Sequence, residues 1–386
     1  MERLHIAFFG ATNSGKSTLV NAICGQEVSL VSAIPGTTTD PVRKTVELPG
    51  LGPCVLIDTA GLGDASELGA ERERKSRAII DETDIAVVVD NGASSIPDLI
   101  RNLETVGIPV IRYTRGESID SLLERLVAAA PKEEARFLTG NLVHAGSSVL
   151  LVMPQDSEAP KGRLILPQVQ VLRELLDRGC VPHSCTPDSL QAALDSLSGQ
   201  PDLVITDSQV FSLVERTIPK ECPLTSFSVL LAAAKGDIRA FVEGARAIDA
   251  LRPGDRVLIA EACTHVPDTE DIGRVKIPAL LRKRMADQVG HDAQGATPGQ
   301  DVTPGQNVTP GLTGSPVNLA VDIAAGNDFP EDLTPYALII HCGACVANAR
   351  LVRSRIRKAL LAGVPITNYG IALAKLNGIL DRISLP

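Results

Sequence analysis

The sequence predicts an α/β protein that is divided into three domains and built on mainly parallel sheets. Its 386 residues are enough for two or three domains of ordinary size. Several segments of strand length are apolar throughout, which is typical of parallel strands buried on both faces. Segments with apolar residues at helical spacing separate these strands, as the crossover connections of a parallel sheet require.

The composition is that of a soluble globular protein, with 44% hydrophobic and 22% charged residues. A net charge of −9 and an aromatic content of 3% argue against a nucleic-acid partner, which needs basic surfaces and aromatic stacking. No apolar run approaches the ~20 residues that span a bilayer, and the first residues do not form a signal peptide. We therefore expect a cytoplasmic protein without a membrane partner, whose eight cysteines are free thiols or metal ligands.

The segment LHIAFFGATNSGKSTLV reads as an apolar strand, a glycine-rich turn and the start of a helix. It fits the pattern G-x-x-x-x-G-K-[ST], in which backbone N–H groups surround the β-phosphate. In this pattern Lys16 reaches the β- and γ-phosphate oxygens and the Ser17 hydroxyl binds magnesium. The predicted nucleotide-binding residues of this segment are Gly10, Asn13, Ser14, Gly15, Lys16, Ser17 and Thr18.

Two later segments complete the predicted phosphate site. The strand in CVLIDTAG ends at Asp58, whose carboxylate can hold magnesium through water, and Gly61 supplies an N–H to the γ-phosphate. Between them lies PGTTTDPV, from which Thr37 or Thr38 can reach the metal, and we take Thr38 as the magnesium ligand. Three such elements in the correct order predict a functional nucleotide site.

This set of motifs resembles the translation-factor-type small GTPases, and more narrowly the branch of the Era and tRNA-modification GTPases. Asn13 stands where members of that branch hold an activating monovalent cation, commonly K⁺. Leu62 stands where Ras-like proteins carry the glutamine that positions water. The resemblance implies GTP and GDP as ligands, Mg²⁺ and K⁺ as cofactors, and slow hydrolysis with Lys16, Asn13 and Thr38 as catalytic residues.

The guanine-reading region departs from this family, which carries Asn-Lys-x-Asp after the next strand. The segment IPVIRYTRGESID offers only Thr114, Arg115 and Glu117 at that place. Alternatively, this segment is the last strand of the domain and the guanine-reading unit has been deleted. Both interpretations predict a first domain of residues 1–132 with weakened base specificity.

Residues 137–225 are predicted to form a small α/β domain with no catalytic constellation. The segments SSVLLVMPQD and PDLVITDS read as strands, and LPQVQVLRELLDRG and PDSLQAALDSLSG read as helices. Cys180, His183 and Cys185 are close enough in sequence to suggest a metal site, but a loop of small buried residues is the commoner arrangement. Three other cysteines lie singly in apolar segments and are predicted to pack in cores: Cys24, Cys54 and Cys222.

Residues 226–386 contain two apolar strands that run into metal-binding residue types. DRVLIAEACTH leads to Cys263 and His265, and YALIIHCGAC leads to His341, Cys342 and Cys345. In a parallel sheet the carboxyl ends of the strands lie along one edge, where ligands bind. We therefore expect three thiols and two imidazoles to meet at this edge.

Three kinds of chemistry use such a set of residues. A structural zinc site takes Cys₃His, a redox pair uses two cysteines at a helix N-terminus, and an iron–sulfur cluster on three thiolates keeps one iron open. The residues themselves leave the cluster and zinc about equally supported, and core cysteines third.

Several segments together resemble the HydF family, the maturation GTPases of FeFe-hydrogenase. They include GRLILPQVQ, GDRVLIAEACTH, NDFPEDL, HCGAC and GVPITNYGIA, and the resemblance extends from the glycine-rich turn to the last helix. It implies a GTPase domain, a dimerisation domain and a cluster-binding domain. It also implies a 4Fe-4S cluster on Cys263, Cys342 and Cys345, with His265 or His341 as possible fourth ligands.

The same resemblance implies a scaffold that carries the diiron precursor of the hydrogenase active site. The implied partners are apo-FeFe-hydrogenase, the radical-SAM maturases and a second copy in a homodimer. An RNA-associated GTPase of the Era branch and a zinc-stabilised regulatory GTPase are the competing functions.

One stretch of the last domain is predicted to be an insertion. The segment ATPGQDVTPGQNVTPGLTG repeats Thr-Pro-Gly within about residues 291–316, and its low complexity predicts a disordered surface loop. Lengthening a flexible loop costs only about 0.6 kcal/mol per doubling, so we expect it to leave the cluster ligands in place.

Overall fold

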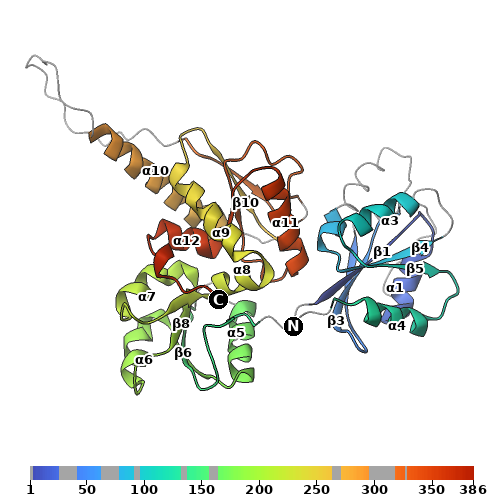
Figure 1. Cartoon of the computed structure of the whole chain (residues 1–386), viewed down its shortest axis with the longest axis horizontal. Helices are drawn as coiled ribbons and strands as arrows, with labels where there is room; N and C mark the ends of the chain where they lie inside the picture. The colour runs from blue at the N-terminus through green and yellow to red at the C-terminus, as the bar shows by residue number, and fades with distance from the viewer. Residues whose placement is uncertain are drawn as a thin grey trace, which may run out of the picture. The chain divides into compact units, whose positions relative to one another are not determined.

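The structure is a computed structural model of the chain (Figure 1). It describes residues 3–25, 41–61, 78–90, 96–131, 137–155, 164–262, 271–294, 318–326 and 328–386. The chain divides into two compact units, which are described separately. The first comprises Met1–Ala135 and Ala347–Arg355, and the second Arg136–Val346 and Ile356–Pro386.

The first unit contains a five-stranded sheet in the order β2-β3-β1-β4-β5. Its strands are parallel except β2, which runs antiparallel to β3. The predicted α/β fold class with mainly parallel sheets is therefore confirmed for this unit. The strands are β1 (Leu4–Gly10), β2 (Val42–Leu48), β3 (Gly52–Asp58), β4 (Ile85–Asp90) and β5 (Val110–Thr114).

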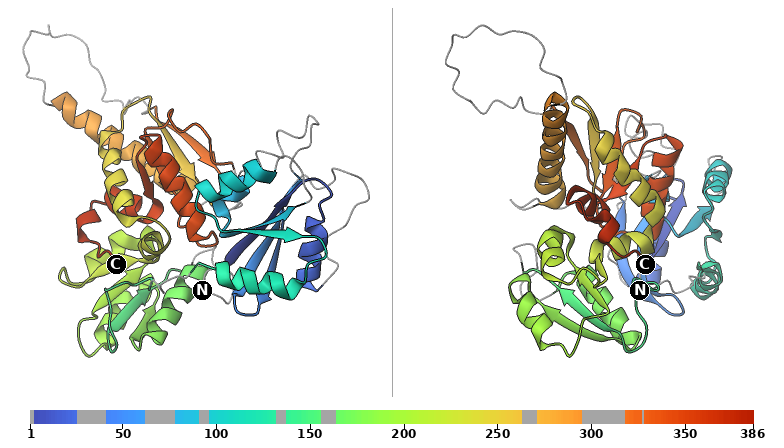
Figure 2. Two further views of the ribbon diagram at one scale, coloured as in Figure 1. Left: turned by 45° about the vertical axis from the view of Figure 1, so that its right-hand side comes forward. Right: turned by 60° about the vertical axis from the view of Figure 1, so that its left-hand side comes forward.

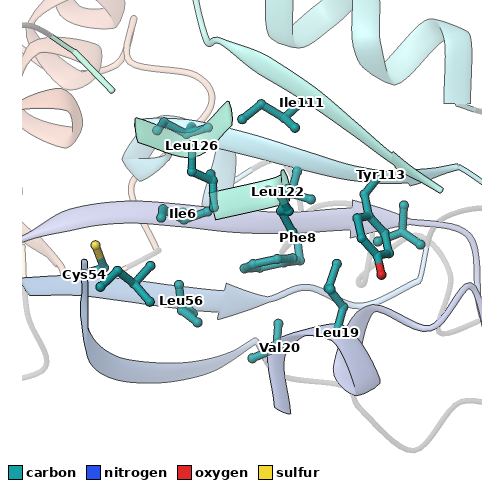
Figure 3. Packing of buried hydrophobic residues seen from close by; sticks show 14 residues of the cluster. Ile6, Phe8, Leu19, Val20, Cys54, Leu56, Ile111, Tyr113, Leu122 and Leu126 are labelled. Carbon is teal, nitrogen blue, oxygen red and sulfur yellow. The ribbon is translucent and has the colours of Figure 1, made fainter. Parts of the chain in front are cut away.

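Among the described residues, this sheet is covered by the helices α1 (Lys16–Cys24), α3 (Ile96–Thr105) and α4 (Ile119–Ala129) and by the helical residues 78–82. Phe8 of β1 faces a core that includes Leu19 of α1 and Leu122 of α4 (Figure 3). The next residue, Phe9, belongs to the core on the opposite face, which includes Ile100 of α3. Because side chains alternate between the faces of a strand, a strand covered on both faces must be apolar throughout.

The second unit contains two four-stranded parallel sheets of identical topology, in the orders β7-β6-β8-β9 and β11-β10-β12-β13. In each, the first strand in sequence lies between the second and the third, and the fourth lies at the edge. The bounds are β6 (Ser148–Val152), β7 (Val181–Cys185), β8 (Leu203–Thr206), β9 (Leu224–Ser226), β10 (Arg256–Ala260), β11 (Ala320–Ala324), β12 (Leu338–His341) and β13 (Ile366–Asn368).

These two sheets make the second unit a structural repeat. The half with β6 to β9 and the half with β10 to β13 are the green and the yellow-to-red parts of Figure 2. In each half the last strand ends on the residue that caps the following helix. Ser226 Oγ accepts from the Val229 N–H at the start of α8, and Asn368 Oδ1 accepts from the Ile371 N–H at the start of α12.

The helices after residue 137 follow the predicted segments where predictions were made; they belong to the second unit, except that the first seven residues of α11 are assigned to the first. LPQVQVLRELLDRG forms α5, PDSLQAALDSLSG forms α6 after a short 3₁₀ turn, and ARLVRSRIRKALLAG forms α11, so these three predictions are confirmed. The bounds are α5 (Leu166–Asp177), α6 (Leu190–Ser196), α7 (Phe211–Thr217), α8 (Phe227–Lys235), α9 (Ile238–Ala245), α10 (Ile277–Gln294), α11 (Ala349–Leu361) and α12 (Tyr369–Leu376).

The cysteines of the middle domain do not form a metal site. The segment predicted as a loop is strand β7, with Cys180 just before it and Cys185 at its end. Five residues of extended chain span roughly 16 Å, too far for two ligands of one metal. The Cys180 thiol instead donates to the His144 carbonyl at 3.3 Å. Burial of Cys54 and Cys222 is confirmed, whereas Cys24 is only partly buried.

Two further predictions concern chain segments rather than sites. Helix α10 continues to Gln294, so the first residues of the predicted insertion at 291–316 are helical, and residues 295–317 lie outside the described part. Among the described helices, none is both long and apolar enough to cross a membrane.

Candidate functional site

The turn between β1 and α1 has the backbone of a phosphate-binding loop. Asn13 and Gly15 both adopt left-handed conformations, with φ of 60° and 99°. A Cβ on Gly10 would lie 2.7 Å from Ser14 Oγ and from the Val89 carbonyl oxygen, so this position admits only glycine. Turns with left-handed residues gather N–H groups into a concave anion site, and the N-terminus of α1 adds its dipole.

Lys16 is folded back onto this loop. Its Nζ donates to the Gly10 carbonyl at 3.1 Å and to the Ala11 carbonyl at 2.8 Å. Burial lowers the pKa of Lys16 to about 8, although the neighbouring Asp58 carboxylate acts in the opposite direction. The loop thus holds a buried ammonium beside the place where phosphate oxygens are expected.

Asp58 ends β3 directly beside the loop, in register with Phe8 of β1. Burial raises the pKa of Asp58, while a hydrogen bond with Ser17 and the charges of Lys16 and Lys44 lower it. Among the described residues, one oxygen of Asp58 and the hydroxyl of Ser14 are buried without a hydrogen-bond partner. Such orphaned oxygen atoms fit a site built for magnesium and phosphate.

Gly61 brings the chain after β3 against the same loop. A Cβ on Gly61 would lie 2.5 Å from Thr12 Oγ1 and 2.7 Å from the Thr12 backbone nitrogen. Only glycine fits this close approach, as expected of a residue whose N–H faces the γ-phosphate. The predicted residues Thr37, Thr38 and Leu62 lie outside the described part of the chain.

The region expected to read the base follows β5, the edge strand of this sheet. Thr114 ends β5, and Tyr113 donates its hydroxyl to the Glu117 carbonyl at 3.2 Å. The Glu117 carboxylate is held in an ion pair with Arg125 of α4. The Glu117 carboxylate is therefore engaged within the domain, and the weakened base specificity stays a prediction.

The cysteine loop, residues 342–346, follows β12 at the carboxyl edge of the second sheet of its unit. Cys342 Sγ accepts the Ala262 N–H at 3.1 Å and the Ala344 N–H at 3.4 Å. The Cys342 N–H in turn donates to the Ala260 carbonyl at the end of β10, at 2.9 Å. The loops after β10 and β12 therefore meet at the Cys342 sulfur, and backbone N–H donors there favour a thiolate.

The predicted third thiol follows directly in sequence. Ala262, whose N–H reaches Cys342, is the residue before Cys263. Cys263 and His265 themselves lie outside the described residues. Within the described part, no three metal-binding side chains come together, and the described thiols of the predicted set are Cys342 and Cys345. The donor set that is present, two thiols of which the Cys342 sulfur accepts from backbone N–H groups, fits an iron–sulfur cluster.

His341 is fully buried at the end of β12. Its Nδ1 lies 2.8 Å from the Cys342 carbonyl oxygen, which can only accept, so Nδ1 carries the proton of this contact. In the neutral imidazole Nε2 then has the lone pair that a metal ligand needs. His341 thus keeps the tautomer of a ligand, and its role as fourth ligand stays a prediction.

Sequence reasoning missed several polar residues around this loop. Glu261 is buried and pairs with Arg274 at 2.8 Å, and Asp271 accepts from the Arg274 N–H at 2.7 Å. Burial, followed by the charges of Cys342 and Glu261, raises the pKa of Tyr369, which keeps its hydroxyl a neutral donor. These residues are spread over 108 positions of the sequence, from Glu261 to Tyr369, so no local pattern links them.

Lys235 was also missed. It is the last residue of α8, is only 5% exposed, and donates from Nζ to the Ala344 carbonyl at 2.8 Å and the Cys345 carbonyl at 3.3 Å. The single signal in the sequence is a lysine that ends a largely apolar helix, FSVLLAAAK. That signal is weak, because a C-terminal lysine also interacts favourably with any helix dipole.

Family models match three consecutive parts of the chain. The model of the hydrogen maturase F dimerization domain matches residues 138–236, and the tetramerization-domain model matches 239–308 and 311–386. A 50S ribosome-binding GTPase model matches residues 5–115. The chain belongs to the hydrogen maturase F family. Its first domain is a GTPase domain, and the two domains particular to hydrogen maturase F follow in order.

Curated relatives resemble only a part of the chain. The tRNA modification GTPase MnmE of Phenylobacterium zucineum is 43% identical over 100 residues, 25% of this chain and 22% of the relative. MnmE of Methylobacterium radiotolerans is 41% identical over 99 residues, with the same shares of both chains. The chain thus spans about a fifth of the length of these relatives. Among solved structures, a variant of Aquifex aeolicus Era bound to GDP.AlF4- matches with 16% identity and a TM-score of 0.27, covering 86% of this chain and 97% of that one.

Proposed function

We propose that the chain is a maturation scaffold for FeFe-hydrogenase. It binds a 4Fe-4S cluster, carries the diiron precursor of the active site and delivers it to apo-hydrogenase. The observation that supports this most directly is the contact of the Ala262 N–H with Cys342 Sγ, which joins the two loops that carry the predicted cluster thiols. Membership of the hydrogen maturase F family supports the same function.

In this proposal the nucleotide site is the switch. Lys16 binds the β- and γ-phosphates, and Ser17, Thr38 and Asp58 hold magnesium, with the orphaned Asp58 oxygen as a point of attachment. Asn13 holds a potassium ion beside the phosphates, which compensates for the missing water-positioning glutamine. GTP hydrolysis is slow and times the loading or release of cargo.

The cluster site would use the thiolates of Cys263, Cys342 and Cys345. Three thiolates would leave one iron of the cluster with an exchangeable position, which His265, His341 or water would fill. The chain's own contribution is to orient the sulfurs and supply N–H donors, as seen at Cys342.

The domains divide the work as the sequence predicts: residues 1–132 bind nucleotide, 137–225 form a homodimer, and 226–386 bind the cluster. The names of the two matching family models, dimerization and tetramerization, support self-association. The proposed partners are apo-hydrogenase and the radical-SAM maturases that supply the diiron precursor.

Anaerobic reconstitution tests the proposal. We expect about four iron and four sulfide per chain, the composition that defines the cluster, and an EPR signal after reduction. Cys342→Ser should lose the iron and keep GTP binding, because Cys342 lies in the second unit and the phosphate loop in the first. Cys185→Ser is the matched control, since Cys185 is a partly buried thiol of the other half.

A colourless protein with one zinc per chain would contradict the cluster and favour the zinc-stabilised GTPase. Equal iron content in Cys342→Ser and Cys185→Ser would show that the cysteine loop is not the cluster site.

A further inference from the structure

The cysteine loop is anchored by a helix of the other half of its unit. Helix α8 follows β9 and lies where the two halves meet (Figure 1). It falls within residues 138–236, which match the dimerization-domain model, whereas the cysteine loop belongs to the following domain. A Cβ on Gly343 would lie 3.6 Å from Ser228 Oγ near the start of α8, and Lys235 at its end reaches Ala344 and Cys345.

The orientation of the loop's peptides explains why a cation stands there. The Ala344 N–H points at Cys342 Sγ, and Ala344 itself has a left-handed backbone with φ of 51°. The Ala344 and Cys345 carbonyl oxygens both accept from Lys235. A left-handed alanine costs roughly 1–2 kcal/mol, so this conformation needs partners that hold it. Charge-assisted hydrogen bonds from an ammonium are among the stronger ones available.

The buried ammonium of Lys235 also exerts an electrostatic effect on groups that it does not contact. Removing a lysine from water is costly, and the hydrogen bonds to the Ala344 and Cys345 carbonyl oxygens offset part of that cost. A positive charge held against the backbone of the loop that carries Cys342 and Cys345 favours the more negative state of whatever those thiolates bind. Reduction of an iron–sulfur cluster adds one negative charge, so a fixed cation nearby raises its reduction potential.

We propose that Lys235 is a positioning residue of the cluster site, which holds the Cys342–Cys345 loop in its thiolate-presenting form and raises the cluster's reduction potential. This inference rests on the proposed function. It adds that a helix within the region matched by the dimerization-domain model controls a property of the cluster.

Three substitutions separate geometry from charge. Lys235→Met removes both the donors and the charge, Lys235→Gln keeps a donor without the charge, and Lys235→Arg keeps the charge. Lys276→Met is the matched control, because Lys276 Nζ donates to Gln209 Oε1 at 2.8 Å, outside the cysteine loop. Each full-length variant is reconstituted anaerobically, and iron per chain, the EPR-monitored redox midpoint and GTP binding are measured.

We expect Lys235→Met to lose most of its iron and Lys235→Gln to keep more of it. The redox midpoint of Lys235→Gln should shift to a more negative value, whereas Lys235→Arg and Lys276→Met stay near the unsubstituted protein. GTP binding should be unchanged in all four variants. If Lys235→Met does not fold, the comparison of the Gln and Arg variants decides.

Equal midpoints in the unsubstituted, Gln and Arg proteins would overturn the role of the charge. Full iron content with an unchanged midpoint in Lys235→Met would overturn the whole inference while the proposed function stands. An unsubstituted protein that takes up no iron would instead refute the proposed function itself.

Discussion

At the scale of single residues, the nucleotide site is a balance between burial and charge. Lys16 and Asp58 are both buried, and burial disfavours the charged form of each, while their mutual attraction favours it. Bound phosphate adds negative charge beside Lys16 and therefore favours the ammonium. Nucleotide binding is thus coupled to the protonation of this lysine.

This coupling predicts that nucleotide affinity depends on pH. In the free protein Lys16 loses its proton as the pH rises through about 8, whereas bound phosphate keeps it protonated. GDP affinity should therefore be constant below that pH and fall above it, by up to tenfold per pH unit for one linked proton. Titrations with fluorescent GDP at about five pH values between about pH 7 and pH 9.5 measure how steeply the affinity falls with pH.

The matched control for this slope is Lys16→Arg, whose guanidinium stays protonated throughout. Its affinity is expected to be weaker but free of the lysine-linked slope, and any slope it keeps belongs to the nucleotide. An affinity of the unsubstituted protein that follows the same pH curve as Lys16→Arg would refute the coupling.

Residues differ in how far the sequence could predict them. The positions of Gly10, Lys16 and Asp58 were predictable because each element of a phosphate loop has a fixed local spacing. Lys235 was not, because its partners are 109 and 110 residues away and only the folded helix brings them together.

At the scale of elements, uniformly apolar runs of residues identified the buried parallel strands. One strand that was predicted as a loop shows where this pattern fails. The segment VPHSC contains polar residues and a proline, yet it forms β7 at the edge of its sheet, where the pattern of a buried strand is not required. The repeat within the second unit also escaped notice. Its two halves have the same strand order and equivalent helix caps but different residues, and strand order cannot be read from local composition.

One helix cap of this repeat, Asn368 at the end of β13, can be tested by its contribution to stability. Asn368 Oδ1 accepts from the Ile371 N–H at 2.9 Å, and Asn368 Nδ2 donates to the Ser228 carbonyl at 3.2 Å. Asn368→Ala should lower the free energy of unfolding by about 1–2 kcal/mol, since it removes the cap and leaves the buried Ile371 N–H unpaired. Urea denaturation followed by circular dichroism measures the loss.

The exposed cap Asp237 at the start of α9 provides the comparison, because its Oδ1 also accepts from two backbone N–H groups. Asp237→Ala should cost about 1 kcal/mol or less. A loss for Asn368→Ala no larger than that for Asp237→Ala would mean that the contact with Ser228 contributes nothing.

At the scale of the whole molecule, one rule places both sites. The phosphate loop follows β1 and Asp58 ends β3, and the cysteine loop follows β12 beside the end of β10, so both lie at the carboxyl edges of parallel strands. The repeat shows that the same edge of the fold can carry different residues, so the fold sets the position of a site but not its chemistry. The position after β8 that corresponds to Cys342 is Asp207, which accepts from Gln168 Nε2 at 2.9 Å. Of the two halves, the described residues carry the Cys-x-x-Cys sequence only in the second.

The division into two compact units predicts that the two ligands can be lost independently. Lys16→Ala removes the ammonium from the phosphate loop and should abolish nucleotide binding, because no other donor in that loop carries a full charge. The iron content and redox midpoint should stay unchanged, since Cys342 and Lys235 belong to the second unit with its own cores. Iron and sulfide assays on anaerobically reconstituted Lys16→Ala, beside GDP titrations of Cys342→Ser, complete the comparison. If either substitution removed both ligands from a protein with unchanged circular dichroism, the two sites would depend on each other for assembly, and nucleotide would be a structural partner of the cluster rather than its switch.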